Sequence, residues 1–304
     1  MKVVLLSGGG GGARFARGLA DVLEPGELTV VGNVGDDVEI LGVHVSPDLD
    51  SLLYTLGGLI DTDRGWGRAD ETWNALESAA SFGGEGWFRL GDRDIGLHLV
   101  RGQALREGTP LSEITAQLSA RVGLGSRIVP ATDDRLRTYV LTPAGRFPFQ
   151  EWFVGRQHRD EVDAVEYDGA ESAHPAPGVL DALEEANAIL FAPSNPYLSI
   201  GPILAVGAIR EAIERRRVRC VAVSPLVGGA AVTGPAARML ARMAGGTTPA
   251  HVSGRYEGLI DCLVVDESDA SDDAGIQVVV ARTVMSDRVI ERRLAEVVLE
   301  AACA

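Results

Sequence analysis

The chain has 304 residues, of which 46% are hydrophobic and 23% are charged, and its formal net charge at pH 7 is −15. This balance excludes an extensively disordered chain, and the acidic charge argues against a general nucleic-acid binder, which needs a basic surface. The three cysteines lie far apart with no metal-binding spacing, and no stretch approaches the ~18 apolar residues of a membrane span. We therefore expect a cytoplasmic protein with neither a membrane nor a nucleic-acid partner.

The first sixty residues predict two parallel strands joined by a helix. The apolar run Lys2–Leu6 indicates the first strand, and apolar residues at helical spacing over Ala13–Leu23 indicate the helix. Leu28–Gly32 indicates the second strand. A further helix opens at Ser46 or the following proline and ends near residue 56. This order is typical of a buried parallel sheet.

The middle of the chain, from about residue 61 to residue 178, follows a different pattern. It shows three or four helical patterns and two or three alternating strands. Ser112–Arg121 indicates a helix capped by Ser112. Arg137–Leu141 and Phe147–Phe153 predict an antiparallel pair of strands. We interpret this segment as a mixed α+β insertion.

Beyond residue 178 the alternation of strands and helices returns. We interpret Asp266–Asp273 as an acidic surface loop without function. We predict a doubly wound, Rossmann-like α/β fold with a mostly parallel sheet, in which residues 1–60 and 179–304 form the core and 61–178 the insertion. The predicted later elements are strands over Ala188–Ala192, Cys220–Val223, Leu259–Val265 and Ile276–Ala281, and helices over Pro202–Arg216, Pro235–Ala244 and Val289–Ala302.

Five consecutive glycines lie where the first strand meets the following helix. The spacing Gly8-x-Gly10-x-x-Ala13 matches the loose dinucleotide-binding pattern. Glycines allow positive φ angles and let backbone N–H groups approach a phosphate at a helix N-terminus. The run lacks the lysine of an ATP-binding loop, and Gly32 and Asn33 stand where an NAD site would have its acid. We expect the loop to bind an anion or a nucleotide; the alternative is a purely structural tight turn.

Four carboxylates lie close together in the sequence, near predicted strand ends. Asp36 and Asp37 follow the second strand, and Asp48 and Asp50 lie in the first turn of the next helix. Carboxylates at such a position suit Mg²⁺, which takes one or two of them plus phosphate oxygens. A turn, a cap and the helix dipole would account for some of the four. Their number favours a divalent metal or a general base.

The segment Trp87–Asp94 combines aromatic side chains with alternating arginines and aspartates, and it leads into a helix that contains His98 and Arg101. Aromatic faces can stack on a planar ring, and Arg89 can pair with a phosphate. The alternative is a local network of arginine–aspartate ion pairs. We interpret His98 by itself as a residue that packs the helix.

Two similar turns follow adjacent strands of the predicted core. The first begins at Ser194 and leads through Ser199–Pro202 into a helix, and the second begins at Ser224 and leads through two glycines into another. Each offers hydroxyl groups, backbone N–H groups and a helix N-terminus. Beside the glycine loop, two such turns predict a cradle for a nucleoside diphosphate.

Taken together, these motifs resemble the 2-phospho-L-lactate transferases, which make the deazaflavin coenzyme F-420. The resemblance spans nearly the whole chain in order and is most specific in Pro47–Asp50 and Leu90–Asp94. Gly11–Arg14, Arg64–Gly67 and Glu71–Asn74 resemble the actinobacterial branch, which is associated with a phosphoenolpyruvyl rather than a phospholactyl donor. The other similar segments are Ser7–Gly10, Asn33–Asp37, Leu53–Leu56, Phe149–Trp152, Ser194–Pro196, Ser199–Pro202 and Ser224–Pro225.

The resemblance implies transfer of a phosphoenolpyruvyl or 2-phospho-L-lactyl group from its guanosine diphosphate ester. The acceptor would be the ribityl hydroxyl of 7,8-didemethyl-8-hydroxy-5-deazariboflavin, and GMP would leave. We expect Mg²⁺ as the cofactor, held by Asp36, Asp37 or Asp48, and a homodimer as the assembly. The alternative function is a non-catalytic, nucleotide-sugar-binding regulator of the related gluconeogenesis-factor family, which lacks the segments like Pro47–Asp50 and Leu90–Asp94.

The resemblance also implies roles for single residues. Asp50 and Arg89 would contact the deazaflavin. Asp50 is the first choice for accepting the hydroxyl proton, and Asp36 is the second candidate catalytic residue. The substrate-binding residues expected besides these are Gly8, Gly9, Gly10, Gly11, Gly12, Arg14, Ser194, Asn195, Ser199 and Gly201.

Overall fold

The computed structural model describes residues 1–270 and 272–304. A seven-stranded sheet forms its centre, in the order β14-β13-β10-β9-β1-β2-β5, and every neighbouring pair of strands is parallel. The order reverses between β1 and β9, so the predicted doubly wound, Rossmann-like fold is confirmed. The strands are β1 (Val3–Ser7), β2 (Leu28–Gly32), β5 (Arg127–Pro130), β9 (Ala188–Phe191), β10 (Cys220–Val223), β13 (Cys262–Asp266) and β14 (Gln277–Ala281).

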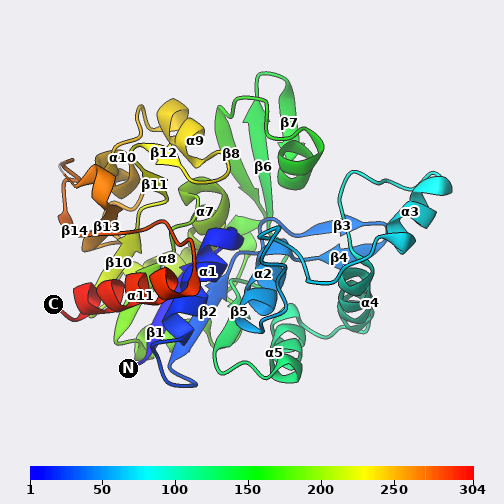
Figure 1. Cartoon of the computed structure of the whole chain (residues 1–304), viewed down its shortest axis with the longest axis horizontal. Coiled ribbons are helices and arrows are strands. Elements are labelled where there is room, and N and C mark those ends of the chain that lie inside the picture. The colour runs from blue at the N-terminus through cyan, green and yellow to red at the C-terminus, as the bar shows by residue number, and fades with distance from the viewer. Residues whose placement is uncertain (271) are drawn as a thin grey trace.

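Helices cover the sheet, because right-handed crossovers between parallel strands place them on its faces. Helix α1 packs between α2 and α11 on one face, and Figure 1 shows these three in front of the strands. Helices α6 and α8 pack together on the other face. The bounds are α1 (Gly9–Ala20), α2 (Pro47–Leu56), α5 (Leu111–Val122), α6 (Val179–Glu185), α8 (Gly207–Glu214) and α11 (Arg288–Cys303).

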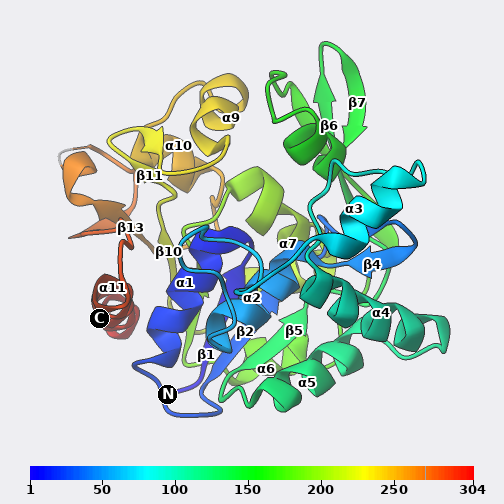
Figure 2. The same ribbon diagram turned by 45° about the vertical axis from the view of Figure 1, so that its right-hand side comes forward.

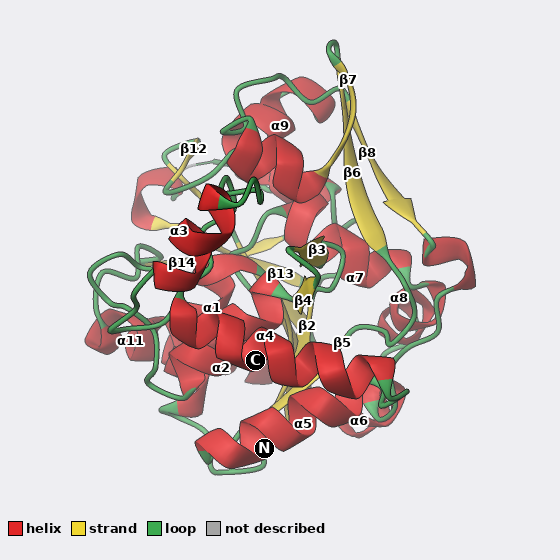
Figure 3. Ribbon diagram, turned by 90° about the vertical axis from the view of Figure 1, so that its right-hand side faces the viewer, coloured by secondary structure: helices red, strands yellow, loops and turns green. Residues whose placement is uncertain are grey.

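Three smaller groups of elements surround the N-terminal end of α1, as Figure 2 shows. The first is the hairpin β3 (Val38–Ile40)–β4 (Val43–Val45) with α3 (Asn74–Ser81) and α4 (Asp92–Arg106). The second is the antiparallel sheet β7–β6–β8, from β6 (Arg137–Thr142), β7 (Gly145–Pro148) and β8 (Ala164–Asp168), which stands out from the body in Figure 3. The third comprises β11 (Leu226–Val227), β12 (Ala230–Ala231), α9 (Ala236–Met243) and α10 (Pro249–Gly254).

The predicted segment 61–178 is more closely joined to the core than its composition indicates. It contains β5, which pairs with β2 in the main sheet, and α5, which packs on β5. The predicted strand Phe147–Phe153 is wrong beyond Pro148, where the chain turns into a π-helix over Glu151–Gly155. Ser112 is not a cap, because the helix already begins at residue 111, and its Oγ donates to Asp133 at 2.7 Å.

Two further boundaries differ from those predicted. Helix α1 begins at Gly9 rather than Ala13, so the glycine run is itself the first turn of the helix. The predicted helix Pro202–Arg216 is two helices, α7 (Gly201–Ala205) and α8, which are separated by Val206 in an extended conformation. Within residues 1–270 and 272–304, no helix combines the length and the apolar character needed to cross a bilayer.

The segment Asp266–Asp273 is not simply an acidic surface loop. Asp266 and Asp269 are both buried. Asp266 accepts a hydrogen bond from the Thr283 N–H at 3.0 Å, and Asp269 accepts one from the Gly228 N–H at 2.9 Å. These carboxylates therefore fix two loops at the edge of the sheet. Residue 271 lies outside the described residues.

Candidate active site

A cavity of about 970 Å³ opens at the carboxyl ends of β1, β9 and β10, beside the point where the strand order reverses. Doubly wound sheets bind their ligands at this place, and the volume lies at the upper end for small-molecule sites. The lining segments are the glycine loop, the start of α2, residues 87–90, residues 149–157 and the turns after β9 and β10. The structure thus brings together segments that are far apart in the sequence.

The glycine loop lies where a side chain has no room. Gly8 caps α1 in an extended conformation, and a Cβ atom there would lie 2.5 Å from Asp48 Oδ2 and 2.8 Å from Ser199 Cβ. Gly9 has a φ of +71°. Its N–H donates to Asp48 Oδ1 at 2.7 Å. Gly10 and Gly11 line the cavity, and their N–H groups lie in the first helical turn, which leaves such groups without intrahelical acceptors. This helix end suits an anionic ligand.

Two of the predicted substrate-binding glycines do not line the cavity. A Cβ atom on Gly12 would collide with the Ser7 hydroxyl and lie 2.7 Å from Ser194 Oγ. A Cβ atom on Gly201 would collide with the Tyr167 hydroxyl. Both glycines are therefore required by close packing behind the site. Their predicted contact with substrate is not supported by their positions.

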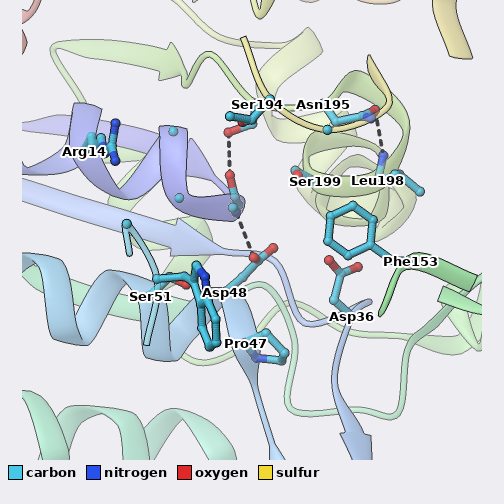
Figure 4. Close-up of a pocket in the computed structure, with 18 of the residues that line it drawn as sticks. Arg14, Asp36, Pro47, Asp48, Ser51, Phe153, Ser194, Asn195, Leu198 and Ser199 are labelled. Atoms are coloured by element: carbon cyan, nitrogen blue, oxygen red, sulfur yellow. Dashed lines mark hydrogen bonds between the residues drawn. The ribbon is translucent and has the colours of Figure 1, made fainter. Parts of the chain in front are cut away.

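The turn after β9 holds the glycine loop in place. Ser194 Oγ donates to the Gly8 carbonyl oxygen at 2.7 Å, and Asn195 Oδ1 accepts from the N–H groups of Tyr197 and Leu198 at 2.9 and 3.2 Å (Figure 4). Asn195 thereby caps a π-helix over Pro196–Ile200. Both side chains line the cavity, as Ser199 does, but their hydrogen bonds within the protein order the turn.

Two buried carboxylates meet beside the glycine loop. Asp48 accepts from Gly9 and, at 2.9 Å, from the Asn33 side chain. Burial raises the pKa of Asp48 to about 6, against the lowering effect of these hydrogen bonds. Asp36 points into the cavity (Figure 4), and its buried Oδ1 has no hydrogen-bond partner among residues 1–270 and 272–304. Burial and then the charge of Asp48 hold the pKa of Asp36 well above its usual range. A pair of this kind attracts a cation.

Asp37 is not among the cavity-lining residues, although its charge also acts to raise the pKa of Asp36 and of Asp48. Its Oδ2 accepts from Ser46 Oγ and contacts His44 Nε2, each at 3.0 Å. Burial acts to lower the pKa of His44, but the carboxylates of Asp37 and Glu39 outweigh it and raise that pKa. The side chain of Asp37 therefore ties the β3–β4 hairpin to the start of α2. Its Oδ1 is buried without a hydrogen-bond partner among the described residues, as that of Asp36 is, and its predicted role as a metal ligand stays a prediction.

Asp50 lines the cavity as part of a buried ion pair. Arg101, from α4, binds both of its oxygens: Nη2 pairs with Oδ1, and Nη1 donates to Oδ2 at 3.1 Å. The same Nη1 lies 3.3 Å from Nδ1 of His98, which also lines the cavity. Burial lowers the pKa of His98 to about 4, so its ring is neutral at pH 7. A hydroxyl proton would have to compete with a guanidinium for the Asp50 oxygens.

The arginines and aspartates of Trp87–Asp94 do not form the local ion-pair network that is the alternative interpretation of this segment. Asp94 is buried and accepts from the Tyr54 hydroxyl at 2.6 Å. Asp92 accepts from Thr72, Asn74 and Ala75 at the start of α3. These hydrogen bonds attach α3 and α4 to the wall of the cavity.

Asp94 predicts a pH-dependent stability. Burial raises its pKa to about 6, above the value of ~3.9 for an unfolded aspartate. The native state therefore binds more protons between these values, and the wild type loses stability as pH rises through this window. Asp94→Asn keeps an acceptor for Tyr54 and does not titrate. Urea unfolding should show it gaining up to ~3 kcal/mol on the wild type between pH 4 and pH 7.

Asp92 provides the control for this measurement. Hydrogen bonds from Thr72, the Ala75 N–H and Asn74 lower its pKa to about 2. The stability that these bonds give is fully present above the unfolded pKa, so Asp92→Asn should show no such trend above pH 5. If the difference in the free energy of unfolding between Asp94→Asn and the wild type were also independent of pH, the raised pKa of Asp94 would be contradicted.

Aromatic and arginine side chains form a second part of the cavity lining. The Trp87 and Phe88 rings meet edge to face at 5.7 Å, and Phe153 stacks on Phe149 at 5.2 Å. Arg89 is exposed at the cavity with its guanidinium 4.8 Å from the centre of the Trp73 ring. Such faces accept a planar ring. The predicted stacking surface is thus present as geometry.

Arg14 lies on the glycine-loop side, and Figure 4 shows it on α1. Its Nη1 donates weakly to the Met285 carbonyl oxygen at 3.4 Å. In the described part of the chain, no carboxylate lies within ion-pair distance of it. An arginine in this state can bind the negative charge of a ligand.

Sequence reasoning missed three parts of the site. Asp50 pairs with Arg101, which lies 51 positions later in the sequence. The one available signal is the helical spacing of Asp94, His98 and Arg101, which places these three side chains on the same face of α4. The loop 283–286 also lines the cavity, and no local motif marks it. His98 was interpreted as a packing residue, yet it lines the cavity.

Comparison with known proteins agrees with this geometry. The family described as 2-phospho-L-lactate transferase CofD matches residues 3–301. A phosphoenolpyruvate transferase of Streptomyces griseus is 48% identical and covers 89% of this chain and 87% of its own. One of Thermobifida fusca is 46% identical and covers 94% and 93%. The crystal structure of a UPF0052-family protein from Bacillus halodurans has a TM-score of 0.66, 17% identity and 98% coverage of both chains, a likeness that shows the fold alone.

The doubly wound sheet, with its cavity at the switch point between a helix N-terminus and a set of aromatic side chains, defines the class as an α/β protein with a ligand-sized crevice at the carboxyl ends of its strands. The family match over residues 3–301 identifies one family within this class. The chain belongs to the 2-phospho-L-lactate transferase CofD family, and it is a transferase in coenzyme F-420 biosynthesis.

Proposed function

We propose that the protein transfers a phosphoenolpyruvyl group from its guanosine diphosphate ester to the ribityl hydroxyl of 7,8-didemethyl-8-hydroxy-5-deazariboflavin. The observation that carries this is that one cavity has two unlike parts, a helix N-terminus suited to anions and a set of aromatic side chains. A nucleotide diphosphate fits the first and a tricyclic ring fits the second. The similar proteins of Streptomyces griseus and Thermobifida fusca are phosphoenolpyruvate transferases, which favours enolpyruvate over lactate as the donor acid. No observation favours the nucleotide-sugar regulator.

The reaction needs alignment more than covalent help. The acceptor hydroxyl oxygen attacks the phosphorus that bears the enolpyruvate, a new P–O bond forms, the bond to the phosphate of GMP breaks, and the hydroxyl proton is released. In such a loose transition state, positioning and charge neutralisation supply most of the rate. Asp50, held rigid by Arg101, lies where it can orient the acceptor hydroxyl. Its predicted role as the proton acceptor stays a prediction.

We propose that Asp36 and Asp48 would hold Mg²⁺. The unpartnered, buried Oδ1 of Asp36 and the mutual repulsion of the two carboxylates fit a cation there. Among residues 1–270 and 272–304, no group of three or more His, Cys, Asp or Glu side chains could hold a metal. Two carboxylates suffice for Mg²⁺ when substrate phosphates complete the shell. When bound, the ion would neutralise charge on the diphosphate.

The donor site is tested by Gly9→Val. Gly9 has a positive φ, which a β-branched residue adopts only under strain, and the side chain would crowd the helix end. GDP affinity, measured by calorimetry, should fall at least about tenfold, or ~1.4 kcal/mol. Deazaflavin binding should change less, and circular dichroism must show a folded variant. If the variant bound GDP unchanged but no longer bound deazaflavin, the assignment of the two substrates to the two parts of the cavity would have to be reversed.

The acceptor site is tested by Arg89→Ala. Because Arg89 is exposed at the cavity and has no resolved ion pair in the described residues, its loss should leave stability unchanged. The acceptor KM should rise by about tenfold while kcat changes little. Arg93→Ala is the matched control, since Arg93 is a nearby exposed arginine on α4 that does not line the cavity. A fall in kcat without a change in KM would contradict the assignment.

Binding tests the function before any turnover is measured. The fluorescence of the deazaflavin should change on addition of protein, and GDP should bind at the same time without displacing it. A UDP-sugar should not compete with GDP. Binding of a UDP-sugar with no response of the deazaflavin would favour the regulator. The expected homodimer and cytoplasmic location stay predictions.

A further inference from the structure

His98 lies in an unusual position for a histidine that packs a helix. Its side chain is only 2% exposed, yet it lines the cavity beside Asp50, with Nδ1 3.8 Å from Asp50 Oδ2. His98 has no role in the proposed reaction as described so far. Its Nδ1 lies 3.3 Å from Arg101 Nη1. Within residues 1–270 and 272–304, its other ring nitrogen, Nε2, makes no hydrogen bond.

The neighbour of Nδ1 decides where the ring carries its proton. A guanidinium has donors only and does not lose its proton in proteins. Arg101 is further held as a cation by its two contacts with Asp50. Nδ1 must therefore accept, and in the neutral ring the proton lies on Nε2. The Asp50–Arg101 pair thus fixes the tautomer of His98.

Resting on the proposed function, we propose that His98 is a binding residue for the deazaflavin acceptor, donating a hydrogen bond from Nε2 to an uncharged oxygen of that substrate. Nε2 is not among the fully buried unpartnered atoms of the described residues, and His98 lines the cavity, so this donor is open to a ligand that supplies the acceptor. The neutral ring suits a carbonyl or a hydroxyl oxygen. Phosphate would instead select an arginine, and Arg14 beside the glycine loop lines the cavity for that purpose.

Two amide substitutions separate this role from packing. His98→Asn keeps an oxygen that can accept from Arg101 but removes the donor at the Nε2 position, whereas His98→Gln places an amide N–H near that position. His98→Asn should raise the acceptor KM and the deazaflavin Kd by at least about tenfold, with the donor KM unchanged. His98→Gln should recover most of this loss. Titration with the ring system that lacks the ribityl chain then distinguishes the oxygens, because the effect persists for a ring carbonyl and disappears for a ribityl hydroxyl.

Two binding results would overturn the proposal. One is His98→Asn with a deazaflavin Kd within twofold of the wild type; the other is His98→Gln no better than His98→Asn while both are folded. Nitrogen NMR of the labelled wild-type protein at pH 7 gives an independent reading, which should show a protonated Nε2 and a bare Nδ1. The opposite tautomer would also refute it. If the wild type binds no deazaflavin at all, the proposed function fails, whereas the NMR result still reports on the tautomer.

Discussion

Asp36→Asn is expected to lower kcat by at least about a hundredfold at saturating substrates and Mg²⁺, the size of loss that follows removal of one strong electrostatic contact. The fold should not suffer. Asp36 is buried without a partner for Oδ1, and its pKa is held well above the usual range, so its charge is costly in the native state. Stopped assays of GMP release give kcat, and urea unfolding gives the stability.

Asp37→Asn is the matched control for this variant. Its side chain serves His44 and Ser46 rather than the cavity, so the change should cost ~1–2 kcal/mol of stability and leave kcat within a few-fold. Chelation of the metal should abolish turnover in the wild type, and Mg²⁺ should restore it. Full activity of Asp36→Asn, or of the wild type in excess chelator, would contradict the proposed role of Mg²⁺.

Arg101→Met should be the most destabilising single change near the site. It leaves the buried Asp50 carboxylate without its partner, and breaking such a pair costs about 3–5 kcal/mol of the free energy of unfolding. The double variant Asp50→Asn/Arg101→Met removes both charges and should recover most of that stability. It should still fail to bind deazaflavin, because Asp50 no longer orients the acceptor. Thermal unfolding and fluorescence titration measure the two effects.

A second ion pair, in which Glu291 is buried and Arg17 half-buried, serves as the control. Arg17 of α1 binds Glu291 of α11 through two hydrogen bonds of 2.8 and 2.7 Å, away from the cavity. Arg17→Met should lose stability for the same reason while deazaflavin affinity stays unchanged. If both arginine variants lost deazaflavin binding in proportion to their stability, Arg101 would have a structural role only.

The elements that the sequence predicts best have strong local signals at their ends. Helix α2 begins at Pro47, as expected from a proline at the first helical position, and β2 matches its predicted bounds at Leu28–Gly32. The start of α1 was missed because glycine has a poor helix propensity. There the helix is supported from outside, by Asp48 accepting the Gly9 N–H. The strand β5 has only four residues and owes its existence to pairing with β2.

The residues of the candidate site also fall into those that the sequence indicates and those that it does not. Glycines, aspartates and serines at strand ends were found because their types and positions already indicate phosphate and cation chemistry. The exclusion of Gly12 and Gly201 from the cavity could not be predicted, since a glycine required by packing looks the same in a sequence as one required by a ligand. The partnership of Asp50 with Arg101 is a tertiary contact between two helices, and no spacing rule reports it.

One measurement tests the central claim most directly. The purified protein is incubated with the deazaflavin, Mg²⁺ and either the enolpyruvyl or the lactyl ester of guanosine diphosphate, and the products are identified by mass spectrometry. The account predicts GMP and the enolpyruvyl phosphodiester of the deazaflavin in equal amounts, with the lactyl ester the poorer donor. Hydrolysis of the donor without any modified deazaflavin, although both ligands bind, would contradict it.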